Sequence, residues 1–142
     1  MRTKLALLIG ITGLAVAGWS AASWAHHAFA AEFDVNQPVK VKGTVTKVEW
    51  VNPHAWLYVD VKDDEGKVVN WHFELGPPNA LFRLGWKKDS IPTGTEVSIS
   101  GFRAKAQDAV ANGRSIILPD GKELFSGGSG PGSEGPKQGE SK

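Results

Sequence analysis

The sequence contains no cysteine, and this absence excludes two ways of stabilising or equipping a small protein. No disulfide framework can hold the fold together, and no thiolate can ligate a metal ion. A transition-metal ligand in this chain must therefore be an imidazole, a carboxylate, a thioether or a backbone group. Attachment of a lipid to a processed N-terminal cysteine is excluded for the same reason.

An excess of charge of either sign is also missing. The chain has 16 Lys and Arg residues and 15 Asp and Glu residues, for a formal net charge of +1. Arg2 and Lys4 lie in a predicted leader, and without them 14 basic residues face 15 acidic ones. A nearly neutral mature chain argues against a nucleic-acid partner, whose phosphates attract a basic surface. The length of 142 residues is that of one domain.

Long hydrophobic runs are absent except near the N-terminus. Residues 1–25 have a basic start, an apolar run over residues 5–18 and an end rich in small residues. This pattern is typical of a secretory signal peptide, and it predicts cleavage after Ala25, export to the periplasm and a mature start at His26. The alternatives are cleavage after Ala30, or an uncleaved segment that anchors the chain in the membrane. The apolar run is shorter than the about 20 residues of a transmembrane helix.

The most regular pattern in the chain is an alternation of apolar and polar residues on both sides of a turn at residues 63–66. A period of two residues is typical of a strand with one buried face, so residues 54–62 and 68–75 predict a β-hairpin. The residues predicted to face the core are Ala55, Leu57, Val59, Val61, Val69, Trp71, Phe73 and Leu75. Antiparallel pairing then places these side chains together on the outer face: His54, Trp56, Tyr58, His72 and Glu74.

The other elements are predicted from shorter signals. The alternation that starts at Val39 changes phase near Thr46-Lys47, which indicates a first strand bent by a β-bulge. A short helix is predicted over residues 80–84, with Asn79 as its N-cap and Gly85 after its end. The remaining segments are predicted as a strand at 96–103, a polar loop at 105–113, a strand at 115–118, and a turn at 119–121 that leads to residues 122–125.

Five strands with a bent first strand, and a helix between the third and the fourth, match the OB-fold. We therefore predict an all-β domain with one short helix, a small five-stranded OB-like Greek-key barrel, over residues 39–125. A small open β-sandwich or roll is the alternative. Residues 26–38 are predicted as an N-terminal arm, either extended or with one helical turn at Phe29 and Phe33. The Gly, Ser, Pro and charged residues of 126–142 predict a disordered tail.

The candidate metal ligands are the four histidines of the chain, His26, His27, His54 and His72. Cleavage before His26 gives this residue a free α-amino group beside its imidazole, and the two groups can chelate one metal ion. A further imidazole, from His54 or His72, would complete a site that resembles the histidine brace of secreted copper proteins. Such nitrogen ligands favour copper, whereas two or three imidazoles alone can also hold zinc. The structural alternative is an exposed leader, a backbone hydrogen bond from His54 and aromatic packing of His72.

The outward Trp56 and Tyr58 predict a function of a second class. Exposed aromatic rings can stack on sugar rings or on an apolar partner, so this face is a candidate interaction module for an envelope protein or a glycan. No Ser-His-Asp order, phosphate loop or Gly-x-Ser-x-Gly elbow is present, and the sequence therefore favours a binding protein over an enzyme. A copper enzyme would also need an open coordination position and a substrate surface, and the sequence indicates neither.

Several motifs together resemble one family. They are His26-His27-Ala28-Phe29, Glu49-Trp50-Val51-Asn52-Pro53-His54-Ala55-Trp56, Gly85-Trp86 and Pro119-Asp120-Gly121. With these residues the sequence is similar, from His26 to about Phe125, to small exported bacterial proteins catalogued as a domain of unknown function, family 6152. The resemblance implies export to the periplasm and a compact β fold, without an established activity. His72 belongs to none of these motifs.

Overall fold

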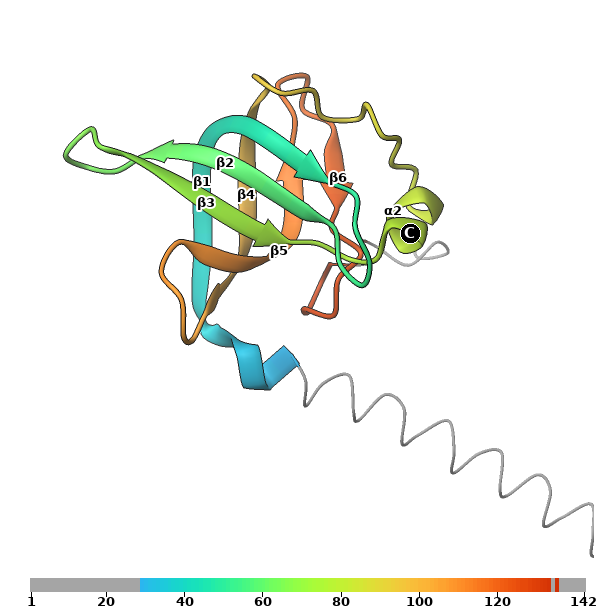
Figure 1. The fold of residues 1–142 in the computed structure, drawn as a ribbon, viewed down its shortest axis with the longest axis horizontal. Coiled ribbons are helices and arrows are strands. Elements are labelled where there is room, and N and C mark those ends of the chain that lie inside the picture. The colour runs from blue at the N-terminus through green and yellow to red at the C-terminus, as the bar shows by residue number, and fades with distance from the viewer. Residues whose placement is uncertain (1–28, 134, 136–142) are drawn as a thin grey trace, which may run out of the picture. The chain divides into compact units, whose positions relative to one another are not determined.

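The computed structural model describes residues 29–133 and 135 (Figure 1). The chain divides into two compact units, Met1–Ala31 and Glu32–Lys142. The predicted signal segment and the pair His26-His27 lie outside the described residues. Residues 29–32 are helical. No helix in the described part of the chain is long and apolar enough to cross a membrane.

The described part of the second unit is mostly β-structure. In chain order its elements are β1 (Phe33–Glu49), β2 (Trp56–Lys62), β3 (Val68–Glu74), α2 (Pro78–Arg83), β4 (Glu96–Ala104), β5 (Val110–Ile117) and β6 (Glu123–Phe125). The predicted all-β fold, with a short helix between the third and the fourth strands, is confirmed. The short β6 is a sixth strand, added to the five that the sequence predicted.

The six strands form one sheet in the order β3-β2-β1-β4-β5-β6, and these neighbours pair antiparallel. A parallel pairing of β3 with β5 joins the two halves, with His72 opposite Val110, Phe73 opposite Ala111 and Glu74 opposite Asn112. Five of the strands therefore close into a ring, from which β6 continues along β5.

The bent β1 takes part in both halves of the ring, as Figure 1 shows. Its residues 38–44 pair with β4 and its residues 44–49 pair with β2, with a register shift between Val45 and Lys47. The bulge predicted at Thr46-Lys47 is confirmed. Gly43 permits the close approach of β1 to β2, because a Cβ at this position would lie 2.3 Å from the carbonyl oxygen of Asp60.

The ring encloses one apolar core, to which α2 contributes Leu81. The core residues that are at most 2% exposed are Val45, Ala55, Leu57, Val59, Phe73, Leu75, Leu81, Val97, Ile99, Ala111 and Ile116. The predicted inward face of the hairpin is thus confirmed for β2 and for the second half of β3. Val69 and Trp71, nearer the hairpin tip, are half-buried.

Two strands begin earlier than the sequence predicted. β1 starts at Phe33, so residues 33–38 of the predicted arm belong to the sheet. β5 starts at Val110, inside the segment predicted as a polar loop. The pattern of β5 is not alternating because both faces of its first half are covered: Ala111, Asn112 and Gly113 are all buried.

The ends of two other segments also differ from the predictions. α2 begins at Pro78, and Pro77 rather than Asn79 occupies the N-cap position. Residues 126–133 of the predicted disordered tail are ordered against β5 and the end of β3. The Ser126 carbonyl accepts a hydrogen bond from the Gly76 N–H at 2.7 Å, and the Ser126 N–H donates to the Arg114 carbonyl at 3.0 Å. Backbone hydrogen bonds hold this segment, and its composition does not reveal them.

Candidate functional site

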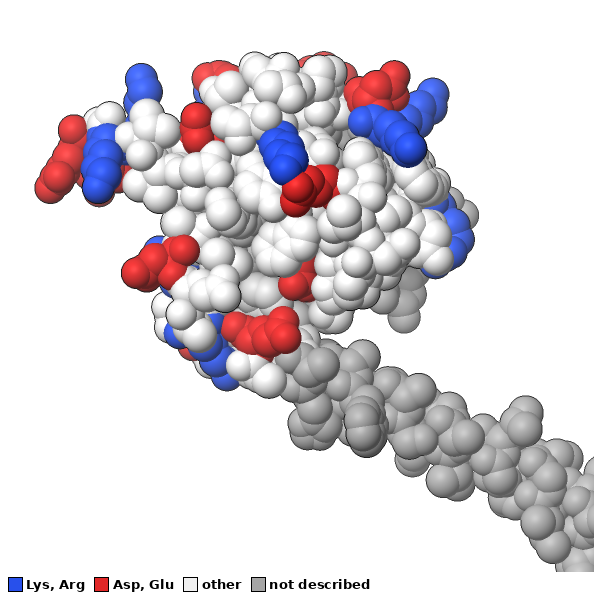
Figure 2. All heavy atoms as spheres, in the orientation of Figure 1, with Lys and Arg blue, Asp and Glu red and all other residues white. Residues whose placement is uncertain are grey.

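Most candidate residues gather on the outer surface of β1, β2 and β3. Tyr58 lies opposite His72 and Lys47, and Trp56 lies opposite Glu74 and Glu49. Because side chains of paired residues lie on the same side of a sheet, these six form one surface, which we call the hairpin face. The register confirms that Trp56, Tyr58, His72 and Glu74 share one side of the sheet, as predicted with His54, but Glu74 is buried and not at the surface. In the view of Figure 2, charged side chains gather at the hairpin tip, while the surface over β2 and β3 carries few.

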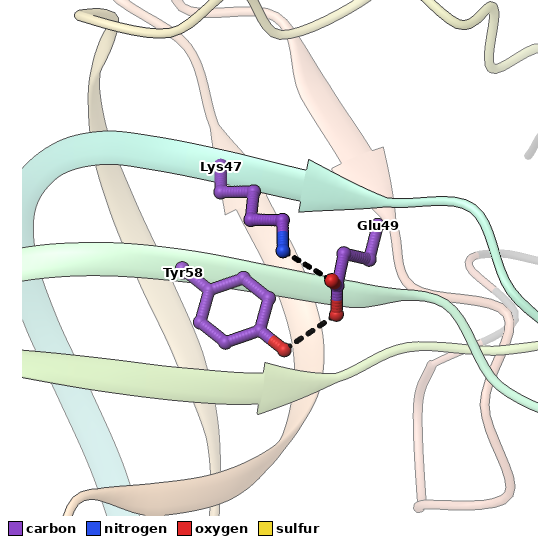
Figure 3. Close-up of polar contacts among 3 residues, drawn as sticks. All are labelled: Lys47, Glu49 and Tyr58. Carbon is purple, nitrogen blue, oxygen red and sulfur yellow. Dashed lines mark hydrogen bonds and ion pairs between the residues drawn. The ribbon is translucent and has the colours of Figure 1, made fainter.

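The carboxylate of Glu49 connects two neighbours in the middle of the hairpin face (Figure 3). It accepts a hydrogen bond from the Tyr58 hydroxyl at 2.6 Å and forms an ion pair with the Lys47 ammonium. Hydrogen bonds from Lys47 and then from Tyr58 lower the pKa of Glu49. The same contact with Glu49 is the main cause that raises the pKa of Tyr58. Tyr58 is therefore fixed as a neutral donor to an ionised acceptor.

His72 packs against Tyr58 across the β2–β3 pair. The centroids of the two rings are 4.7 Å apart and the rings meet edge to face, at an interplanar angle of 63°. This is the aromatic packing that the sequence allowed as the structural alternative for His72. The imidazole is half-buried in this position.

His54 and Glu74 form an ion pair at the end of the hairpin face. The Nδ1 atom of His54 lies 3.3 Å from Oε1 of Glu74, and the two side chains are 39% and 9% exposed. Burial raises the pKa of Glu74, whereas the nearby His54 lowers it. The carboxylate lies on the Nδ1 side of the imidazole, so Nε2 is the ring nitrogen on the other side.

Asn112 lies across the β3–β5 pair from Glu74. Its side chain is fully buried and lies close enough to Glu74 to lower the pKa of that carboxylate. Sequence reasoning missed this residue because it falls in the segment predicted as a loop. It also missed Lys47, although the shared parity of Lys47 and Glu49 could have indicated their contact.

The structure does not bring His54 and His72 together. His72 lies opposite Tyr58 in the β2–β3 pair, and Tyr58 follows His54 by four residues in the chain. At about 3.3 Å per residue, the two backbones are about 13 Å apart, and each ring contacts a different neighbour. Within residues 29–133 and 135, no group of three or more His, Asp or Glu side chains could hold a metal ion. The candidates His26 and His27 lie outside these residues.

A second aromatic cluster lies beside the loop that carries His54. Trp50 stacks on Phe82 of α2 with centroids 5.2 Å apart, and it meets Trp86 edge to face at 6.1 Å. The Trp86 indole donates a hydrogen bond to the Phe125 carbonyl at 2.8 Å. Trp86 is thus a core residue, whereas Phe82 stays 44% exposed.

A comparison with family models gives one match, to a family of unknown function (DUF6152), over residues 14–113. The matched region contains His26 and His27, the whole hairpin face, and Asn112 of β5. A comparison with curated proteins finds no match.

Proposed function

Since the chain belongs to the DUF6152 family, whose description names no activity, we propose a function from the geometry of the site. The protein is a periplasmic binding protein that holds a copper ion, with zinc as a weaker ligand, at the His54 end of the hairpin face. The signal-like pattern of residues 1–25 supports export, with a mature chain that begins at His26. The nearly balanced charge of this mature chain supports a partner other than a nucleic acid.

We also propose that the fold is an OB-like Greek-key barrel. The ring order β1-β2-β3-β5-β4, the parallel β3–β5 pair and the position of α2 between β3 and β4 support it. In such a fold, a loop at one end of the ring is a suitable place for a binding residue, because the strands hold both ends of the loop. His54 lies in the loop between β1 and β2.

The contact between His54 and Glu74 is the observation that carries the metal proposal. In metal sites, a ligating histidine almost always donates its second ring N–H to a carboxylate or a carbonyl. Oε1 of Glu74 lies 3.3 Å from Nδ1 of His54, and this distance supports the proposal that Nδ1 donates to Glu74 while Nε2 binds the metal. Glu74 is only 7% exposed, so water competes little with the His54 imidazole for its carboxylate. The carboxylate can therefore keep the ring in one orientation.

The remaining ligands would come from the mature N-terminus. The α-amino group and imidazole of His26, with His27 as a further donor, supply nitrogen ligands, and Cu(II) prefers these in a tetragonal arrangement. Zinc accepts imidazole ligands too, but it gains less from the chelating amine. A cleavage site one residue away would remove the amine from His26, so the proposal depends on the exact N-terminus.

The experiment begins with mass spectrometry of the protein purified from the periplasm, for which we expect a mature start at His26. This protein is then titrated with Cu(II) and with Zn(II) by calorimetry, and the Cu(II) complex is examined by electron paramagnetic resonance for nitrogen ligands. We expect tighter binding of Cu(II) than of Zn(II). Copper should be released at acid pH as the imidazoles and the amine take up protons.

Four variants separate this proposal from incidental copper binding. His54→Ala and one extra N-terminal alanine should each weaken binding, and Glu74→Gln should weaken it by about 10- to 100-fold through loss of ring orientation. The matched control is His72→Ala, which removes an imidazole from the same face without touching Glu74 and should leave the affinity unchanged. Equal, weak binding by the parent and all variants would show that the histidines are not a metal site.

The hairpin face also supports a second function, as an interaction module for an envelope protein or a glycan. Its favouring observation is the immobilised Tyr58, held by Glu49 at the hydroxyl and by His72 at the ring, next to the half-buried Trp56. A ring that is already ordered loses little entropy when a partner stacks on it. Titration with peptidoglycan fragments, using Trp56→Ala and the control Val68→Ala at the hairpin tip, tests this function; binding insensitive to Trp56 would contradict it.

A further inference from the structure

A cleft of about 430 Å³ lies beside Trp71 and is lined by Gln37, Pro38, Val39, Trp71 and Arg103. Trp71 precedes His72 in β3, so its side chain is on the opposite side of the strand from the hairpin face. The cleft is therefore separate from the His54 site, and it shares no residue with it. Its volume is in the range of small-molecule sites, about 300–1,000 Å³.

Arg103 is the chemically distinctive residue of the cleft. Its guanidinium carbon lies over the Trp71 ring, 5.3 Å from the centroid. Trp71 is itself fixed, because it packs against the core and stacks with Phe73 at 5.8 Å. The aromatic ring thus holds the guanidinium in place by a cation–π contact. Among the described residues, Arg103 forms no ion pair, so its planar set of N–H donors has no carboxylate partner.

The surroundings of the guanidinium favour an anion from outside the chain. The Asp34 carboxylate, which does not line the cleft, accepts hydrogen bonds from the Asn36 N–H at 2.9 Å and from Gln37 Nε2 at 3.2 Å. An adjoining hollow of about 260 Å³ is lined by Gln37 and residues 103–108, which include Lys105 as a second cation and Asp108 as an acid. Pro38 and Val39 give the cleft an apolar wall next to the charge.

The loop beside the cleft is held in an unusual conformation. Ala109 has a φ of 54°, and it is the one non-glycine residue with positive φ among those described. Its carbonyl accepts the N–H of His72 at 2.9 Å, which ties the end of the β4–β5 loop to β3. Such conformations persist where the surrounding structure holds them, and they are common at ligand clamps. The C-terminal end of the β4–β5 loop is therefore tied to β3 next to Trp71.

We infer that this cleft binds a small ligand that carries a carboxylate on an apolar body. The carboxylate pairs with the guanidinium of Arg103 through two parallel hydrogen bonds, and the apolar body lies on Pro38 and Val39. An aromatic acid and the C-terminal residue of a peptide both have this chemistry. The inference does not depend on the proposed metal site.

The test uses nuclear magnetic resonance of the ¹⁵N-labelled full mature protein, in which Trp71 indole and Arg103 Nε signals report on the cleft. The protein is titrated separately with benzoate, N-acetyl-leucine, the neutral analogue benzamide and inorganic phosphate. We expect saturable shifts of both signals with benzoate or N-acetyl-leucine, and none with benzamide. Which of the two acids binds more tightly distinguishes an aromatic acid from a peptide terminus.

Two variants at neighbouring cations complete the design. Arg103→Lys keeps the charge but loses the planar fork, so carboxylate affinity should fall by at least about tenfold. Lys105→Gln removes a neighbouring cation and should change the affinity by no more than about twofold, because exposed charges act weakly through water. Thermal melting checks that both variants are folded. Equal binding of phosphate, an unaffected Arg103→Lys variant, or the absence of saturable shifts with both acids would overturn the inference.

Discussion

At the scale of single residues, Tyr58 offers a direct measurement because it is the one tyrosine in the chain. Its hydrogen bond to the Glu49 carboxylate raises its pKa above the usual value of about 10. We expect the tyrosinate absorbance of the folded protein to appear at higher pH than that of the unfolded chain. In Glu49→Gln, which keeps an acceptor but loses the negative charge, the pKa of Tyr58 should fall toward the usual value.

The sign of the linked stability follows from the direction of the shift. The folded state holds the Tyr58 proton more tightly, so the stabilising contribution is complete below pH about 10 and is lost as the pH rises through the folded pKa. Glu49 behaves in the opposite way. Its pKa is lowered in the folded state, so its contribution to stability is lost as the pH falls through that folded pKa. Asp60→Asn is the control, because it removes a carboxylate from the same surface that does not contact Tyr58. Identical titration of Tyr58 in the parent and Glu49→Gln would contradict the contact.

The sequence predicted which residues of this site share a surface, but not what each one contacts. Alternation alone placed Trp56, Tyr58 and His72 on the outer face, since the period of a strand is independent of tertiary structure. The contact of His54 with Glu74 depends on the β2–β3 register and on a loop conformation, and neither is visible in the local pattern. Asn112 could not be recognised at all, because its importance arises from pairing with a distant strand.

At the scale of elements, the hairpin allows a paired test of the two faces. Val59 is fully buried in β2, and Lys62 is exposed at the end of the same strand. Val59→Asp buries a carboxylate without a partner, which should cost several kcal/mol of a total stability of about 5–15 kcal/mol. Lys62→Asp should change the stability by no more than about 0.5 kcal/mol. Chemical denaturation of both variants measures the difference, and equal midpoints would show that the faces are wrongly assigned.

Elements with a strong local signal were predicted well, and elements defined by their partners were not. The hairpin strands, the bulge near Thr46 and the short helix all have patterns of apolar, glycine or proline residues within a few positions. The first residues of β5 have no such pattern, because both faces of this part of the strand are buried and neither needs polar side chains. Residues 126–133 carry no apolar side chain, and their order comes from buried serines and backbone hydrogen bonds.

At the scale of the whole β unit, the closure of the ring is the feature that no local pattern indicates. β3 and β5 are separated by α2 and β4 in the chain, and they meet in parallel over three residue pairs. The β1–β4 pairing is much longer, with contacts from Phe33 to Thr44. The ring therefore has one short seam, and the buried Asn112 lies at this seam opposite Glu74.

We expect the β3–β5 seam to open before the rest of the ring. A short parallel pairing provides fewer hydrogen bonds than the long antiparallel ones, so its local opening exposes less apolar surface and costs less free energy. Hydrogen exchange followed by nuclear magnetic resonance measures this directly. The His72 amide, which donates to the Ala109 carbonyl at the seam, should exchange faster than the core amides of β1 and β4.

Two alanine-to-glycine variants, one in the seam and one outside it, test whether the seam opens first. Ala111 is fully buried opposite Phe73 in the seam, whereas Ala104, the last residue of β4, pairs with Phe33 outside the seam. Glycine in a strand costs about 0.5–1 kcal/mol relative to alanine. Ala111→Gly should therefore accelerate exchange at His72 more than in the core of β1, and Ala104→Gly should leave the exchange at His72 unchanged. If Ala111→Gly accelerates all protected amides equally, the ring opens only as a whole, and the seam is not its weakest joint.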